Sequence, residues 1–133
     1  MREILFKAKR KDNGEWMEGY YRADPDLDTH YICGWNYYAS ENGLEREPFE
    51  EEINPDTLCQ YTGFTDKSGK KIWENDIAHI RSSGLSGYGV VKYQNGNLVL
   101  VDEKRKRTYS LYGEWKIRKD GNIFDNADLL EVK

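Results

Sequence analysis

The chain has 133 residues, a length that predicts one domain or two small lobes, because it can bury one adequate core. Hydrophobic residues make up 38% of it and include ten Tyr, four Trp and four Phe, which suits strands and argues against disorder. The net charge of -4 argues against general-purpose binding to phosphate backbones.

Charge is divided unevenly along the chain. Residues 1–66 hold 7 basic and 15 acidic side chains, whereas residues 67–133 hold 13 and 9. The two halves are therefore expected to attract each other or to attract different partners.

Cysteine content and hydropathy bear on the compartment. Cys33 and Cys59 are too few and too isolated for a disulfide scaffold, and no apolar segment follows Met1 as in a signal peptide. No run approaches the roughly 18 apolar residues that a membrane span needs. We therefore expect a cytoplasmic protein without a membrane span.

The first predicted element is a hairpin. Apolar and polar residues alternate over 4–9, a turn signal follows at 12–14, and 16–21 supplies the second strand. A two-residue loop at Asn13-Gly14 would set Asp12 against Glu15, so the loop is expected to be longer.

The next segments predict one more strand and a long acidic loop. Residues 24–28 form a turn and 29–35 a strand, with Tyr31 and Cys33 on one face. The glutamate-rich stretch 40–53 predicts an exposed, mobile loop with at most one helical turn.

The stretch 60–77 is predicted to organise the rest of the chain. A turn at 54–56 leads into a strand at 57–61, and two short extended pieces then double back through a polar turn at 66–69. Asn75 tolerates positive φ, which suits a bend that ends one strand and starts the next. We call 60–77 the hub and expect it to join two β-rich halves.

Beyond the hub, a strand at 76–81 precedes a flexible loop at 82–87. The strongest hairpin signal is Asn95-Gly96, where a two-residue loop pairs Tyr93 with Leu98 and Val91 with Leu100. A basic turn is predicted at 104–107, further strand material at 109–117, a turn at 119–122, and a tail whose Asp128-Leu129-Leu130 closes the core.

Regularly spaced turns and the lack of a long 3.6-residue period predict an all-β or β-rich fold. The expected architecture is a small barrel or sandwich of consecutive hairpins around the hub. We expect a single domain, 1–133, with two small lobes at about 1–62 and 63–133 as the alternative.

Two charged segments are candidate contact surfaces. The acidic one would dock a protein partner or mimic nucleic acid, or is simply a solvated face; its candidates are Glu45, Glu47, Phe49, Glu50, Glu51 and Glu52. The basic one would bind single-stranded nucleic acid by charge and stacking, or serves solubility and edge protection; its candidates are Lys104, Arg105, Lys106, Arg107 and Tyr109.

Sites for metals and catalysis are weakly indicated. His30, Cys33 and Cys59 lack the spacing of a zinc site, and the aspartates of 24–28 fail the pattern of a calcium loop, so no metal or cofactor is expected. Glu74 and Asp76 in the hub are candidates for an acid/base pair, although Asp76 is favoured as a turn cap. No catalytic residue is assigned.

A set of motifs runs nearly end to end through the chain: Arg2-Glu3-Ile4, Phe6, Ala8, Trp16, Glu18-Gly19-Tyr20, Gln60-Tyr61-Thr62-Gly63-Phe64, Asp66, Gly69-Lys70, Ile72, Glu74-Asn75-Asp76-Ile77, Gly89-Val90-Val91, Tyr93, Gly121-Asn122-Ile123, Asp125-Asn126 and Leu129-Leu130. On these residues the chain resembles the YopX-like family, encoded largely by bacteriophages and prophages of Gram-positive bacteria. The family often has Gly at the position of Asn75, and Asn keeps access to the same left-handed conformation.

The resemblance implies a β-rich phage accessory protein of uncharacterised role, and it brings no catalytic residues. Its motif residues are mostly glycines, turn-forming polar residues and aromatics, which we interpret as fold determinants. The first expectation is a non-catalytic module that binds a host or phage protein. A nucleic-acid-binding barrel using the basic half is the alternative, an enzyme is third, and self-association stays open.

Overall fold

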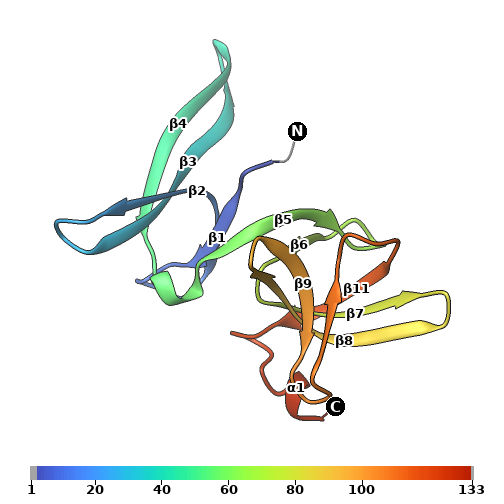
Figure 1. The fold of residues 1–133 in the computed structure, drawn as a ribbon. Coiled ribbons are helices and arrows are strands. Elements are labelled where there is room, and N and C mark those ends of the chain that lie inside the picture. Colours follow the sequence, from blue (N-terminus) through green and yellow to red (C-terminus); the bar gives the residue numbers. More distant parts are fainter. Residues whose placement is uncertain (1–2, 133) are drawn as a thin grey trace. The chain divides into compact units, whose positions relative to one another are not determined.

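The structure is a computed structural model that describes residues 3–132, most of which lie in antiparallel strands (Figure 1). The all-β prediction is confirmed. Within the described residues the strands form open sheets, and a closed barrel is not found. Backbone contacts divide the chain into two compact units, Glu3–Gln60 and the residues from Tyr61 onward.

The first unit contains most of a six-stranded antiparallel sheet, in which the strands follow the order β4-β3-β2-β1-β5-β6. Its elements are β1 (Phe6–Lys9), β2 (Trp16–Asp24), β3 (Thr29–Ser40), β4 (Gly43–Glu52), the 3-10 helix η1 (Pro55–Thr57) and the start of β5 (Cys59–Thr65). Lys9 stands opposite Trp16, so the first loop is longer than two residues, as predicted.

The core of the first unit is small. Ala8, Ile32 and Ile53 are fully buried, and the partly buried side chains packed on them are Phe6, Met17, Tyr21, Phe49 and Leu58. Gly34 makes room for this packing, because a Cβ there would lie 2.8 Å from the Phe49 ring. The root of the β3–β4 hairpin is thereby held against the sheet.

The acidic stretch 40–53 is a strand, so the prediction of a mobile loop there was wrong. β4 pairs with β3 from Tyr31↔Glu52 to Ser40↔Gly43, and a turn at 41–42 joins them. Glu and Pro are poor strand formers, but strand formation depends on what the partner strand offers. β3 offers β-branched and aromatic residues along its length, and that information lies outside the acidic stretch itself.

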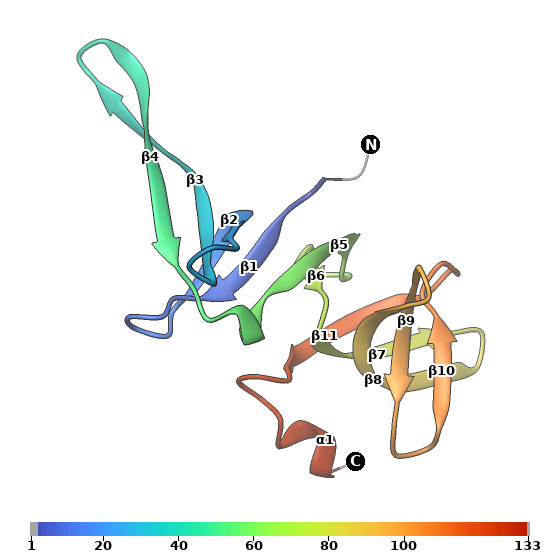
Figure 2. The same cartoon turned by 60° about the vertical axis from the view of Figure 1, so that its left-hand side comes forward.

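The second unit is built on a five-stranded sheet in the order β10-β9-β8-β7-β11 (Figure 2). Its elements are the rest of β5, β6 (Lys71–Trp73), β7 (Asp76–Ser82), β8 (Leu85–Gln94), β9 (Asn97–Asp102), β10 (Arg107–Ser110), β11 (Lys116–Asn122) and α1 (Leu129–Val132). One face carries the larger core: Ile72, Ala78, Ile80, Val91, Leu98, Leu100, Leu111 and Ile117.

Several local predictions in the second unit are confirmed. β5 and β6 double back through the hub, Asn75 has φ of 72°, and the Asn95-Gly96 turn sets Tyr93 opposite Leu98. The turn at 104–107 is found largely as predicted, since β9 ends at Asp102 and β10 begins at Arg107.

Two predicted irregular segments are instead part of the sheet. The stretch 82–87 is a tight hairpin, because Ser83 and Gly84 take φ of 43° and 87°, as a two-residue turn of the primed kind needs. The predicted turn at 119–122 is wrong, because β11 continues past Lys119 through a register shift before Gly121. A bulge absorbs the turn-forming residues without ending the strand.

The sheet of the second unit splits along β8. β8 pairs with β7 over Leu85–Val90 but with β9 only from Val90 onward, so β9 and β10 run steeply across the direction of β7 and β8 (Figures 1 and 2). A Cβ on Gly89 would lie 2.1 Å from the Val101 carbonyl oxygen, so only glycine permits this approach. The split opens a hollow between the two hairpins.

Candidate functional site

The β3–β4 hairpin continues beyond the rest of its sheet. Cys33 is the last β3 residue paired with β2, whereas β3 and β4 go on pairing as far as Ser40↔Gly43. Figure 1 shows the two strands running on together as a narrow arm. We call residues 35–48 the distal ribbon.

The two faces of the distal ribbon differ in chemistry. Strand alternation and cross-strand register put Trp35, Tyr37 and Ala39 on one face with Leu44, Arg46 and Pro48. On this aromatic face Trp35 is 43% exposed, Tyr37 62% and Leu44 75%. The Arg46 guanidinium lies 4.0 Å from the centre of the Trp35 ring. The opposite face carries Asn36, Tyr38, Glu45 and Glu47.

The acidic candidates separate into two groups along β4. Glu50, Glu51 and Glu52 lie at the root, where they form ion pairs with Arg22 (2.9 Å), Arg10 (3.3 Å) and Lys11 (3.0 Å). The hydrogen bond from Arg22 lowers the pKa of Glu50. The pKa of the Cys33 thiol is raised by its burial and by its contact with the Glu50 carboxylate. Phe49 packs into the core, so Glu45 and Glu47 are the candidates on the distal ribbon.

The basic candidates also fall into two groups, those that line a pocket and those that do not. A pocket of about 460 Å³ occupies the hollow beside β8, and Arg105, Arg107 and Tyr109 line it, whereas Lys104 and Lys106 do not. Other side chains that line the pocket are Arg118, His79 and Tyr88, and no sequence pattern indicated His79 or Tyr88 as part of this site. Arg118 stands opposite His79 and His79 opposite Tyr88 in the strand register, so the three form a row across β11, β7 and β8.

Carboxylates hold two of the pocket's three guanidinium groups. Arg118 donates to both oxygens of Asp120 at 2.9 and 3.4 Å, and Arg105 donates to the buried Asp102 at 3.2 Å. Burial of the Tyr88 hydroxyl raises its pKa, and the negative charge of Asp120 adds a smaller rise. Tyr109 donates its hydroxyl to the Ser86 carbonyl at 3.4 Å, which ties β10 to β8 at the pocket wall.

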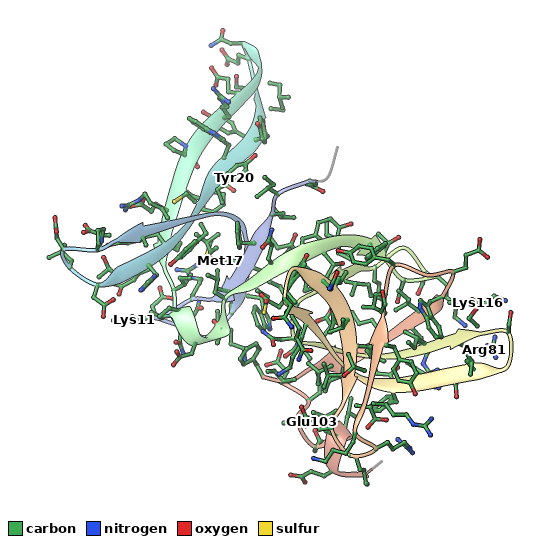
Figure 3. The ribbon with its side chains drawn as sticks, in the orientation of Figure 1. Lys11, Met17, Tyr20, Arg81, Glu103 and Lys116 are labelled. Carbon is green, nitrogen blue, oxygen red and sulfur yellow. The ribbon has the colours of Figure 1, made fainter. Side chains whose placement is uncertain are left out.

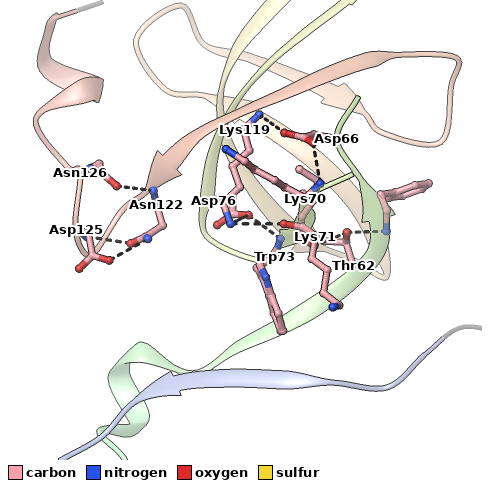
Figure 4. A network of polar contacts seen from close by, with 12 residues as sticks. Thr62, Asp66, Lys70, Lys71, Trp73, Asp76, Lys119, Asn122, Asp125 and Asn126 are labelled. Atoms are coloured by element: carbon pink, nitrogen blue, oxygen red, sulfur yellow. Dashed lines mark hydrogen bonds and ion pairs between the residues drawn. The ribbon is translucent and has the colours of Figure 1, made fainter. Parts of the chain in front are cut away.

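The hub is a network of polar contacts rather than an open cleft (Figure 4). Fully buried Asp76 accepts a hydrogen bond from the Trp73 amide at 2.8 Å and forms an ion pair with Lys119 at 3.2 Å. Asp66 accepts from the amides of Ser68 and Lys70, each at 2.9 Å. Asp76 therefore caps the bend, as the sequence favoured.

Lys119 was not foreseen as part of the hub. It lies on β11, donates its amide to Asp66 at 3.4 Å and its ammonium to the Lys71 carbonyl at 3.5 Å, in addition to its ion pair with Asp76. A pairing across 43 or more positions leaves no local sequence signal. Lys119 thus closes the hub instead of adding to an exposed basic surface.

The candidate metal ligands have other partners. The Tyr21 hydroxyl lies 2.6 Å from Nδ1 of His30, Cys33 points to Glu50, and Cys59 contacts the Thr57 carbonyl at 3.3 Å. Across residues 3–132, no group of three His, Cys, Asp or Glu side chains is placed to hold a metal ion. In the same range, no helix is long and apolar enough to cross a membrane.

Comparisons with known proteins bear on the family and the fold. The family model described as YopX protein matches residues 5–131. No curated protein matches the chain. A solved structure to which it is similar is the crystal structure of protein EF1440 from Enterococcus faecalis, with a TM-score of 0.58 and 18% identity over 98% of this chain and 99% of that one. At this identity the similarity concerns the fold alone.

Proposed function

The chain belongs to the YopX family, and from this premise we propose that it is a non-catalytic module that binds a host or phage protein through its distal ribbon. The observation that carries the proposal is the exposed aromatic face of Trp35, Tyr37 and Leu44. A two-stranded ribbon is marginally stable alone, and exposed aromatic side chains are enriched at protein interfaces. The ribbon therefore gains most from a partner that covers this face.

The charge of the distal ribbon indicates which kind of partner surface would complement it. Glu41 lies at the tip, and Glu45 and Glu47 lie on the face opposite the aromatic residues, so the distal ribbon carries net negative charge despite Arg46 on its aromatic face. A surface with an apolar centre and basic residues at its rim would complement them. Pairing of β4 with a second β4 is disfavoured, because Pro48 and like-charged glutamates protect that edge.

The test is affinity capture from cells induced to express the protein, followed by identification of the retained proteins. The double variant Trp35→Ala with Tyr37→Ala is compared with Tyr20→Ala with Leu27→Ala, which removes apolar side chains that are at least as exposed elsewhere in the first unit. We expect the ribbon variant to lose a partner that the control variant retains, with equal melting temperatures. Equal retention by both variants would refute the ribbon as the contact.

The setting of this activity is part of the proposal. We place the protein in the cytoplasm of a cell that carries a phage or prophage, as the composition and the family resemblance suggest. Self-association is tested separately, by light scattering of the purified chain. A stable dimer that dissociates in the ribbon variant would make a second copy the partner.

A further inference from the structure

The pocket beside β8 gathers positive charge that is scattered in the sequence. Arg118 reaches it from β11, whereas Arg105 and Arg107 reach it from the β9–β10 hairpin. The split in the sheet brings these groups to one hollow, since β8 before Val90 pairs with β7 and not with β9. The pocket is thus a consequence of the fold rather than of one basic run.

The ion pairs within the pocket leave donors for a ligand. A guanidinium has five N–H donors, of which Arg118 directs two at Asp120 and Arg105 one at Asp102. Both side chains are more than half exposed. Arg107 adds a third guanidinium, so three positive charges face two carboxylates, and the formal excess equals the single charge of a phosphodiester.

Tyr88 and Tyr109 give the pocket aromatic walls beside this charge. Arginine favours phosphate because its planar fork can donate two parallel hydrogen bonds to neighbouring oxygens. The volume of about 460 Å³ falls in the range of small-ligand sites and exceeds what one phosphate needs. Other proteins bind single-stranded nucleic acids with this combination of basic groups and stacked aromatic rings.

We propose that this pocket binds the phosphate of a nucleotide unit, either in single-stranded nucleic acid or as the free nucleotide, with Arg105, Arg107 and Arg118 as the ligand-holding residues. Ligand binding at this pocket does not require the distal ribbon to bind a protein. The proposed site includes only part of the basic turn at 104–107, because Lys104 and Lys106 do not line the pocket.

The test is fluorescence anisotropy of labelled dT12 at 50 mM salt, with wild type, Arg107→Ala and Arg118→Ala. The matched control is Arg81→Ala, an exposed arginine beside Lys116 that does not line this pocket (Figure 3). Loss of a charge-assisted phosphate contact is expected to weaken binding by about tenfold in each pocket variant. Arg81→Ala is expected to stay within about twofold of wild type, because only general charge is lost.

Competition then separates the two sources of phosphate. Displacement of dT12 by adenosine monophosphate but not by adenosine would show that the pocket takes a single nucleotide. Displacement by unlabelled dT12 alone would assign it to a strand.

Three results would overturn the proposal. The first is no binding of dT12 or adenosine monophosphate even at 50 mM salt. The second is an equal loss in Arg81→Ala and Arg107→Ala, which would indicate diffuse charge. The third is displacement of dT12 by a hexaglutamate peptide as effective as that by the oligonucleotide, which would indicate a site for any anion. Variant melting temperatures, expected to match wild type, exclude unfolding as the cause of any loss.

Discussion

Asp66 shows how one side chain organises the hub. Burial alone would raise its pKa, but hydrogen bonds from the amides of Lys70 and Ser68, the Ser68 hydroxyl and the Lys119 amide outweigh burial and hold the pKa below its ordinary value. A carboxyl with a lowered folded-state pKa stabilises the fold above the unfolded-state pKa of about 3.9, and this contribution is lost as pH falls through the folded value.

We therefore expect Asp66→Asn to lower the free energy of unfolding and to make that free energy less sensitive to acidic pH. At pH 7 the variant should lose about 2 kcal/mol, because the amide cannot accept all the hydrogen bonds of the carboxylate. Between pH 5 and pH 3 its stability should fall less than that of wild type. Urea unfolding at both pH values tests this, with the exposed Asp26→Asn as control. Parallel pH profiles for wild type and Asp66→Asn would contradict the role of the carboxylate.

Hub residues could be predicted where their partners are near in sequence. Asp66 bonds Ser68 and Lys70, and Asp76 bonds Trp73, all within four positions, so turn chemistry alone indicated them. The contribution of Lys119 depends on β11 lying beside β7, which no short pattern encodes. The same limit left His79 and Tyr88 out of the candidates that line the pocket.

At the scale of elements, two hairpins of the second unit use the same backbone solution. Ser83-Gly84 takes φ of 43° and 87°, close to the 52° and 80° of Asn95-Gly96. Asn visits the left-handed region at lower cost than Ser. Ser83→Asn should therefore stabilise the protein by about 0.5 kcal/mol, seen as a higher melting temperature. Ser82→Asn, placed in the strand before the turn, is the control, and an equal gain there would show that the turn is not the cause.

These hairpins also show what local patterns convey. The Asn-Gly signal located one turn and its register, whereas Ser-Gly among other small residues was interpreted as flexible. The acidic stretch was misjudged for a related reason, since β4 is a strand because β3 pairs with it over its full length. Partner strands decide such segments, and a pattern in one segment does not report its partner.

For the whole molecule, the charge asymmetry links the two proposed sites. A net charge of -4 repels a polyanion, although the pocket in the second unit is basic. At low salt the screening length reaches about 30 Å, so even distant carboxylates act on an approaching strand, whereas at 0.3 M only groups within several ångströms do. The glutamates of the ribbon should therefore weaken dT12 binding mainly at low salt.

Neutralising that charge tests this coupling. Replacing Glu41, Glu45 and Glu47 by Gln changes the net charge from -4 to -1, and we expect it to strengthen dT12 binding about threefold at 10 mM salt. At 0.3 M the difference should vanish, because no contact in the pocket has changed. The triple Glu→Asp variant keeps the charge and should behave as wild type. A gain that persists at 0.3 M would contradict a purely long-range electrostatic effect of these glutamates.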